Sequence, residues 1–385
     1  MKKIVCIPDS FKGTLSSSTV CEVMKTAIHQ HLPHCDVIAI PVADGGEGSV
    51  DAFLSAMGGE KVYCRVFNPY FEPMEAFYGR LNEHTAVIEM AASAGLPLVL
   101  NRLNPSLTTT YGVGELILDA IDHGAHTIIV GLGGSSTNDG GCGAAAALGV
   151  KFYDKDGIPF IPVGNTLINI ASIDVSQAKE KLKGINIITM CDIDNPMYGL
   201  TGAAHIFAPQ KGADAKMVLE LDKGLKHLAL MMAEHCSVDV SDLAGGGAAG
   251  GMGAGMVAFF QSTLQMGIET ILDVVKFDEI LNDTDLVFTG EGRIDSQTLR
   301  GKVAVGVAQR ALKQGVPVIG VVGAIGEDIN DVYSKGITAL FSINPVPMAF
   351  EEAKHHAKDN LSITMDNIMR TISNLKIIEH PQSHD

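Results

Sequence analysis

Charged and polar side chains follow short apolar runs at five points of the chain. They lie in Asp9–Lys12, Asp44–Glu47, Gly133–Gly141, Cys191–Pro196 and Gly290–Asp295. In an open α/β sheet, the loops at the carboxyl ends of the strands form the ligand crevice. Because acids, hydroxyls, amides and cations gather in these loops, the sequence predicts an enzyme that handles a charged, phosphate-like group.

The stretch from Asp285 to Lys302 is the richest in such groups. Glu291 and Asp295 could hold Mg²⁺, an ion that favours carboxylates together with phosphate oxygens. Arg293 and Lys302 could neutralise a phosphoryl group during its transfer. The alternative is a structural loop, in which Arg293 forms a salt bridge and Asp295 caps a helix.

Three further loops offer candidates, each with a structural alternative. Asp192, at a predicted strand tip, is a metal or base candidate, but an Asx turn before Pro196 would also use an acid there. Ser135 and Asn138 are expected at the start of a helix, where hydroxyl and N–H groups suit an anion; simple N-capping is the alternative. Lys211 adds a cation within a compact turn.

The glycine-rich segment 245–258 fits the pattern G-x-G-x-x-G. No clean strand precedes it, so a dinucleotide fingerprint is disfavoured. A loop that meets a phosphate and a helix that packs closely remain as alternatives. No Walker A motif is present, because Val303 follows Lys302 where that motif needs Ser or Thr.

The composition excludes several classes of protein. The formal net charge of −16 opposes binding to nucleic acid and to anionic membranes, so an anionic substrate would need local cations. The uncharged stretch Leu243–Phe260 is too rich in glycine for a membrane anchor. The 7 cysteines are scattered without a C-x-x-C pair, and we expect a cytoplasmic protein with reduced thiols.

The 385 residues favour two domains. We expect an α/β protein with a doubly wound, Rossmann- or flavodoxin-like domain whose sheet is mostly parallel. It would comprise residues 1–58, 105–150 and 276–385, and a smaller mixed α/β domain would comprise residues 59–104 and 151–275. The main expected elements are a strand at Ile4–Ile7, a helix capped near Ser16, an antiparallel meander over Lys61–Glu89, a strand at Thr127–Val130 and a helix over Lys216–His235.

Seven blocks, in one order along the chain, resemble class I bacterial glycerate kinases. They are IPDSFKGTLSS, PVADGGEGS, VGLGGSSTNDGG, CDIDNP, FAPQKGA, GAAGGMGAG and TGEGRIDSQTLRGK. The resemblance implies two α/β domains and phosphorylation of D-glycerate by ATP with Mg²⁺, with 2-phosphoglycerate as the expected product. Ser136, Ser49 and the pair Val303-Ala304 depart from the usual family residues, but none of these departures removes an ionisable group.

Three alternatives remain open: phosphorylation at the 3-hydroxyl, a dinucleotide-dependent hydroxy-acid oxidoreductase, and a sensor that binds its ligand without turnover. The sequence is compatible with a homodimer but does not determine the oligomeric state. It also does not separate the loops that bind ATP from those that bind glycerate.

The loops and the resemblance together give a set of expected site residues. The expected catalytic residues are Asp44, Asp192, Arg293, Asp295 and Lys302. The expected metal ligands are Asp192, Glu291 and Asp295. The residues expected to bind substrate or nucleotide are Asp9, Ser10, Lys12, Gly45, Gly46, Glu47, Gly134, Ser135, Asn138, Asp139, Asn195, Lys211, Gly250, Gly251, Gly290, Gly292 and Thr298.

Overall fold

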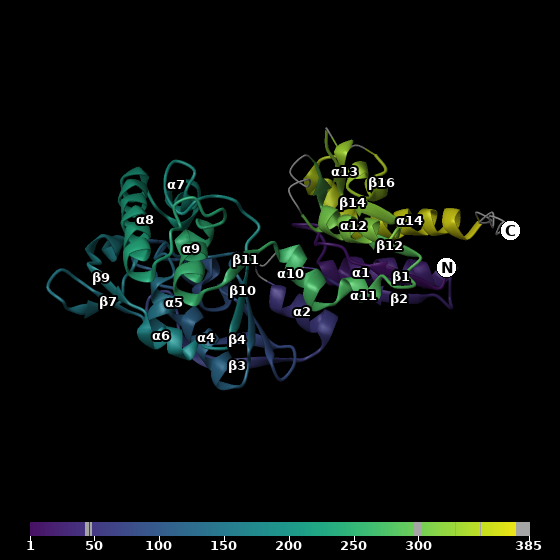
Figure 1. The fold of residues 1–385 in the computed structure, drawn as a ribbon. Coiled ribbons are helices and arrows are strands. Elements are labelled where there is room, and N and C mark those ends of the chain that lie inside the picture. The colour runs from purple at the N-terminus through teal and green to yellow at the C-terminus, as the bar shows by residue number, and fades with distance from the viewer. Residues whose placement is uncertain (43–45, 47, 296–301, 328, 347, 375–385) are drawn as a thin grey trace. The chain divides into compact units, whose positions relative to one another are not determined.

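The computed structural model describes residues 1–42, 46, 48–295, 302–327, 329–346 and 348–374. The chain divides into two compact units (Figure 1). Unit 1 comprises Met1–Val42 and Leu272–Asp385, and unit 2 comprises Ala43–Ile271.

Unit 1 is built on a five-stranded sheet in which every pair of neighbours is parallel. Its strands are β1 (Lys3–Cys6), β2 (Asp36–Ala39), β12 (Leu286–Thr289), β14 (Val318–Val322) and β16 (Ile337–Ser342). The order across the sheet is β16-β14-β12-β1-β2. Numbered within this unit, that is the 2-1-3-4-5 order of flavodoxin-like folds, and its switch point lies between β1 and β12.

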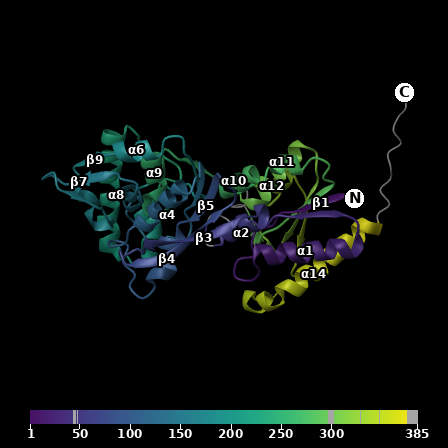
Figure 2. The ribbon, with the colours of Figure 1, turned by 90° about the horizontal axis from the view of Figure 1, so that it is seen from below.

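Helices cover both faces of this sheet. Figure 2 shows α1 and α14 on one side and α12 on the other. The helices of this part of the chain are α1 (Ser17–His31), α10 (Gly267–Val274, at the junction with unit 2), α11 (Phe277–Ile280), α12 (Val303–Lys313), α13 (Asp331–Ser334) and α14 (Phe350–Asn374). The short strands β13 (Arg293–Ile294) and β15 (Ala324–Ile325) pair with each other. The expected cap of the first helix is confirmed, since Ser16 Oγ accepts a hydrogen bond from Thr19 N at 3.2 Å.

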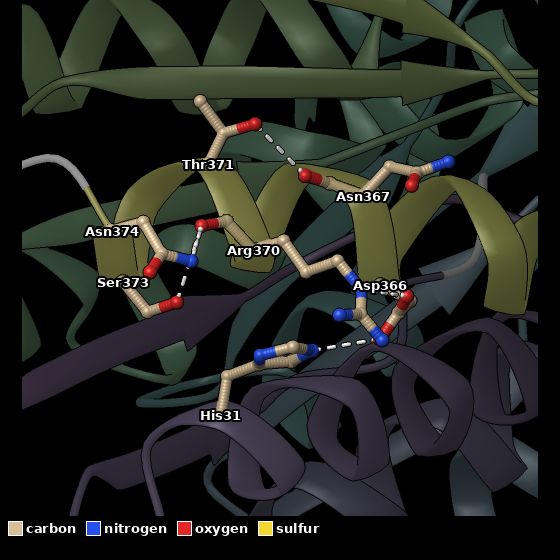
Figure 3. Close-up of polar contacts among 7 residues, drawn as sticks. All are labelled: His31, Asp366, Asn367, Arg370, Thr371, Ser373 and Asn374. Carbon is tan, nitrogen blue, oxygen red and sulfur yellow. Dashed lines mark hydrogen bonds and ion pairs between the residues drawn. The ribbon is translucent and has the colours of Figure 1, made fainter.

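A polar cluster joins α14 to α1 (Figure 3). His31 Nε2 lies 2.7 Å from Asp366 Oδ1, and Arg370 Nε donates to Asp366 Oδ2 at 2.7 Å. Hydrogen bonds from Arg370 and then from His31 hold the pKa of Asp366 below its ordinary value. On the same helix, Leu361 and Met365 are fully buried. The helix is therefore attached by an apolar face and by this cluster.

Unit 2 contains a six-stranded mixed sheet in the order β11-β10-β6-β5-β4-β3. Its strands are β3 (Glu60–Phe67), β4 (Pro73–Arg80), β5 (Thr85–Glu89), β6 (Thr127–Gly131), β10 (Asn186–Met190) and β11 (Thr263–Gln265). β3, β4 and β5 pair antiparallel, which confirms the predicted meander, and the other neighbours are parallel. A small antiparallel sheet joins β7 (Lys151–Tyr153) to β8 (Pro159–Phe160) and β9 (Ser172–Asp174).

The helices of unit 2 surround the core of its large sheet. They are α2 (Ser49–Met57), α3 (Ala91–Ala94), α4 (Tyr111–Asp122), α5 (Cys142–Ala147), α6 (Ser176–Lys181), α7 (Ala203–Phe207), α8 (Ala215–Cys236) and α9 (Ala248–Phe260). Three short 3₁₀ helices are η1 (Leu96–Val99), η2 (Gly164–Asn169) and η3 (Pro209–Lys211). Within the described part of the chain, no helix has the length and apolar character that a membrane crossing requires.

The observed division of the chain differs from the one expected from the sequence. Residues 43–58 and 105–150 lie in unit 2, not with the flavodoxin-like unit. The reason is the pairing of β6, which lies between β5 and β10. The unit with the mixed sheet is consequently the larger one, the reverse of the expected sizes.

Candidate active site

A cavity of about 450 Å³ lies in unit 2 at the carboxyl ends of β6 and β10. The loops after these two strands contribute Gly133–Ser135 and Cys191–Ile193 to its wall. Much of the remaining wall is apolar and comes from Leu96, Leu132, Met190, Phe207, Ala248 and Ala249. The cavity is therefore placed where parallel sheets bind ligands.

Lys211 is a buried cation on the wall of this cavity, with only 2% of its surface exposed. Its Nζ donates to Ser135 Oγ and to the carbonyl oxygen of Thr137, both at 2.7 Å. Burial lowers the pKa of Lys211 to about 7, and the nearby carboxylate of Asp139 acts in the opposite direction. Lys211 ends η3, and Gly212 follows with φ +100°, which confirms the compact turn.

Asp139 is fully buried and holds the loop between β6 and α5. Its carboxylate accepts four hydrogen bonds, two from Thr110 and one each from the amides of Gly141 and Gly143. Burial raises the pKa of Asp139, and these hydrogen bonds oppose that rise. Asp139 is not among the residues that line the cavity, so its visible role is to fix the loop that carries Ser135.

The expectation that Ser135 and Asn138 lie at a helix start needs correction. α5 begins only at Cys142, and an irregular loop separates it from β6. Ser135 lines the cavity, whereas Asn138 is fully buried. Neither Oδ1 nor Nδ2 of Asn138 has a hydrogen-bond partner among the residues that the structure describes. A buried side-chain amide without a hydrogen bond lowers the stability of the folded state, and unbonded buried groups of this kind are few in native proteins.

The glycine-rich segment packs against the same loop. Gly250 and Gly251 have φ of +69° and +89°, and a Cβ on Gly250 would lie 2.0 Å from the carbonyl oxygen of Thr137. Ala249, which lines the cavity, also has a positive φ of 54°. This conformation is uncommon for a non-glycine residue, but the helix caps Ser237 and Gln261 adopt it too, so it does not by itself mark a site. Residues 237–247, all described, contain no strand, so the dinucleotide pattern lacks its required context.

Asp192 is the acid that the β10 loop brings to the cavity wall. Its Oδ1 accepts a hydrogen bond from the amide of Gly267 at 2.7 Å. Asp194, two residues further on, is not part of the wall. Asn195 instead closes its own loop, since its Nδ2 donates to the carbonyl oxygen of Thr201 at 2.8 Å.

Unit 1 brings together the loops that follow β1 and β12, at the switch point of its sheet. The amide of Asp9 donates to the carbonyl oxygen of Gly290 at 2.8 Å. A Cβ on Gly292 would lie 3.3 Å from the amide nitrogen of Lys12, so the two loops run closely side by side. Ser10 belongs to the first of these loops and Glu291, which is 6% exposed, to the second.

Two expected catalytic residues of unit 1 contact each other. Arg293 Nε lies 3.3 Å from Asp295 Oδ2, and the Arg293 side chain is 67% exposed. This is the salt bridge that the structural alternative predicted. Lys302 is exposed and stands at the N-cap position of α12. Asp44, Gly45, Glu47 and Thr298 lie outside the described residues, whereas Gly46 is described and lines the unit 2 cavity.

The expected metal ligands are divided between the two units. Asp192 belongs to unit 2, whereas Glu291 and Asp295 belong to unit 1. Among the residues that the structure describes, no group of three His, Cys, Asp or Glu side chains could hold a metal ion. Mg²⁺ that arrives with a nucleotide needs only one or two carboxylates beside phosphate oxygens and water. The exposed carboxylate of Asp192 fits that requirement, but the described residues do not fit an all-protein cage.

Glu89 is a residue of this region that the sequence reasoning missed. It ends β5, is 4% exposed, and its Oε1 accepts a hydrogen bond from the amide of Val50 in the first turn of α2. Burial raises its pKa. Its position could have been recognised from the sequence, because Glu89 ends the apolar run Thr85–Glu89 and the other candidate acids were chosen because they follow such runs.

A buried cation, glycine-rich loops and acids at the carboxyl ends of parallel strands suit a ligand that carries phosphate groups. The comparisons with known proteins make the class definite. Residues 4–373 match the sequence profile described as "Glycerate kinase family". The chain therefore belongs to the glycerate kinase family, a family of kinases.

Curated relatives match over nearly their whole length. A glycerate kinase of Bacillus cereus is 46% identical over 368 residues, covering 95% of this chain and 97% of the relative. The glycerate 2-kinase of Escherichia coli is 43% identical over 373 residues, covering 96% and 98%. A crystal structure of a candidate glycerate kinase 2 from Salmonella typhimurium LT2 superposes with a TM-score of 0.86 at 42% identity, covering 96% of this chain and 98% of that one.

Proposed function

We propose that this kinase transfers the γ-phosphoryl group of ATP to the 2-hydroxyl of D-glycerate, giving 2-phosphoglycerate and ADP. Membership of the glycerate kinase family supports the acceptor, and the similarity to the Escherichia coli glycerate 2-kinase supports the position. The observation that carries the proposal is Lys211, a buried ammonium on the wall of a strand-end cavity. In a chain with net charge −16, it is a local cation of the kind that an anionic ligand requires.

The reaction is a displacement at phosphorus. The hydroxyl oxygen of glycerate forms a bond to the γ-phosphorus, the bond from that phosphorus to the β,γ-bridging oxygen breaks, and ADP leaves. The hydroxyl proton passes to a carboxylate, for which Asp44 and Asp192 are the candidates. Catalysis of this kind consists mainly of positioning and charge neutralisation.

Several described residues have proposed parts in this step. Lys211 and Ser135 bind an anionic group in the unit 2 cavity. Asp192 would hold Mg²⁺, which would neutralise phosphate charge when bound. In unit 1, Lys12 and Arg293 contribute positive charge at the loops after β1 and β12. Asp295 orients Arg293 through their 3.3 Å contact and is the second candidate for a metal carboxylate.

A coupled assay of ADP release tests the proposal. We expect ADP formation that requires D-glycerate and Mg²⁺ and that is much slower with L-glycerate. Asp192→Asn should lower kcat by about 100-fold, the range of electrostatic groups in active sites. The matched control is Asp194→Asn, whose side chain is not part of the cavity wall. If both variants were as active as the wild type, Asp192 would have no part in the mechanism. If the wild type released no ADP in a glycerate-dependent manner, the proposed function would be refuted.

A further inference from the structure

We infer that the unit 2 cavity is the nucleotide subsite, with its apolar wall against the adenine base and Lys211 with Ser135 against the phosphates. The inference rests on the proposed function. It adds an assignment that the sequence left open, namely which of the two sets of strand-end loops binds ATP.

The size and lining of the cavity favour a nucleotide over the acceptor. Its volume of about 450 Å³ falls in the range of sites for ligands larger than a three-carbon acid. D-glycerate carries a carboxylate and two hydroxyls on three carbons, so it has almost no apolar surface to cover this wall. A purine has two apolar faces, and Phe207, half-buried at the end of α7, can contact one of them.

The polar groups of the cavity suit phosphate oxygens. Lys211 uses two of its three ammonium protons for Ser135 Oγ and the carbonyl oxygen of Thr137, which leaves one for a ligand. Ser135 accepts from Lys211, so its own hydroxyl proton is available to a second ligand oxygen. Both groups therefore present donors to an anion in the cavity that they line.

The corresponding loops of unit 1 have a different character. Asp9, Ser10 and Lys12 follow β1, and Arg293 with Asp295 follows β12. These side chains offer charges and a hydroxyl, as a small hydroxy acid requires. The unit 2 cavity, by contrast, has the apolar wall that a base needs.

A consequence of the assignment is that nucleotide binding takes up a proton. The pKa of Lys211 is lowered to about 7 by burial, so just above neutral pH much of the free protein carries this side chain uncharged. A phosphate group beside Nζ favours the ammonium form and raises that pKa. Binding measured near pH 8 should therefore be accompanied by protonation of Lys211.

Titration calorimetry of the full chain with ADP, in the absence of glycerate, tests the assignment. Lys211→Met should weaken ADP binding by about 10- to 100-fold, the effect of losing one hydrogen bond to a charged group. The KM for D-glycerate should stay within about threefold of the wild-type value, because a variant that loses only nucleotide contacts still binds the acceptor. At pH 8, two buffers of different ionisation enthalpy should report proton uptake in the wild type and none in Lys211→Met. Lys226→Met, an exposed position on α8, is the matched control and should behave as the wild type.

Phe207→Ala provides a second test that does not depend on Lys211. It should weaken ADP binding about tenfold, the scale of one lost base–aromatic contact, and leave the binding of inorganic tripolyphosphate unchanged. If Lys211→Met does not fold by circular dichroism, this variant decides the question alone.

Two outcomes would overturn the assignment. The first is unchanged ADP affinity in both variants. The second is a raised KM for D-glycerate with unchanged ADP affinity, which would make the cavity the acceptor site. Failure of the proposed function would be seen separately. If the wild type bound ADP through Lys211 but released no ADP from ATP in the presence of D-glycerate, the nucleotide site would stand and the proposed reaction would be wrong.

Discussion

The buried ammonium of Lys211 should leave a signature in the pH dependence of stability. Its pKa is about 7 in the folded protein, against an ordinary value of 10.5. Below pH 7 both the folded and the unfolded chain carry this proton. Between pH 7 and 10.5 the unfolded chain keeps the proton that the folded chain has released, so a rise in pH favours the folded state.

The magnitude follows from that difference in proton binding. Relative to Lys211→Met, the free energy of unfolding of the wild type should rise by about 2 to 3 kcal/mol between pH 7.5 and 9.5, at ~1.36 kcal/mol for each proton and pH unit. Lys211 is 2% exposed, so solvent screening does not reduce this figure. Other groups that titrate in this range, such as the buried thiols, are common to both variants and cancel.

Urea unfolding followed by circular dichroism at several pH values measures this difference. The control Lys226→Met, on the exposed side of α8, should track the wild type at every pH. If the difference between wild type and Lys211→Met were the same at pH 7.5 and 9.5, Lys211 would hold its proton throughout. The claim that burial lowers the pKa of Lys211 to about 7 would then be wrong.

Three further predictions concern packing and charge. Gly250→Ala should lower the free energy of unfolding by about 3 kcal/mol or more, because its Cβ would lie 2.0 Å from the carbonyl oxygen of Thr137. The control is Gly157→Ala, where φ is +76° and a Cβ would meet no atom within 4 Å, so the free energy of unfolding should fall by only about 1 kcal/mol. Similar losses for the two variants in urea titrations would contradict the steric argument. Asn138→Leu should raise the free energy of unfolding by about 1 kcal/mol, since it removes a buried amide without a described partner; a large destabilisation would mean that the amide is bonded after all. Asp366→Asn should lower Tm near pH 7, and the difference should vanish in acid as wild-type Asp366 takes up its proton through its lowered pKa; a difference that persisted at pH 2 would refute the electrostatic explanation.

Local signals were sufficient to predict most elements of the fold. The apolar runs at the first strand and at Thr127–Val130 became β1 and β6, and Ser16 caps α1 as expected. These features depend on residues close together in the sequence, where capping and apolar patterning act directly. The strand-end loops were predictable for the same reason, because each follows an apolar run at once.

The partners of each element were harder to predict. The apolar residues Ile128–Val130 of β6 would suit parallel pairing in either unit, so its sequence does not reveal that it pairs with β5 and β10. The surroundings of Lys211 also depend on contacts far along the chain, since Ser135 and Thr137 lie more than seventy residues away. A turn with a lysine indicates a cation but does not indicate that it is buried.

The measurement that tests the central claim most directly is proton-coupled phosphorus NMR of a reaction of the full chain with ATP, Mg²⁺ and D-glycerate. We predict the loss of the γ-phosphate signal, the appearance of ADP, and a new phosphomonoester split into a doublet by the single proton on C2. A triplet from the two protons on C3 would place the phosphoryl group on the other hydroxyl. No new phosphomonoester, with ATP intact, would contradict the proposed reaction itself.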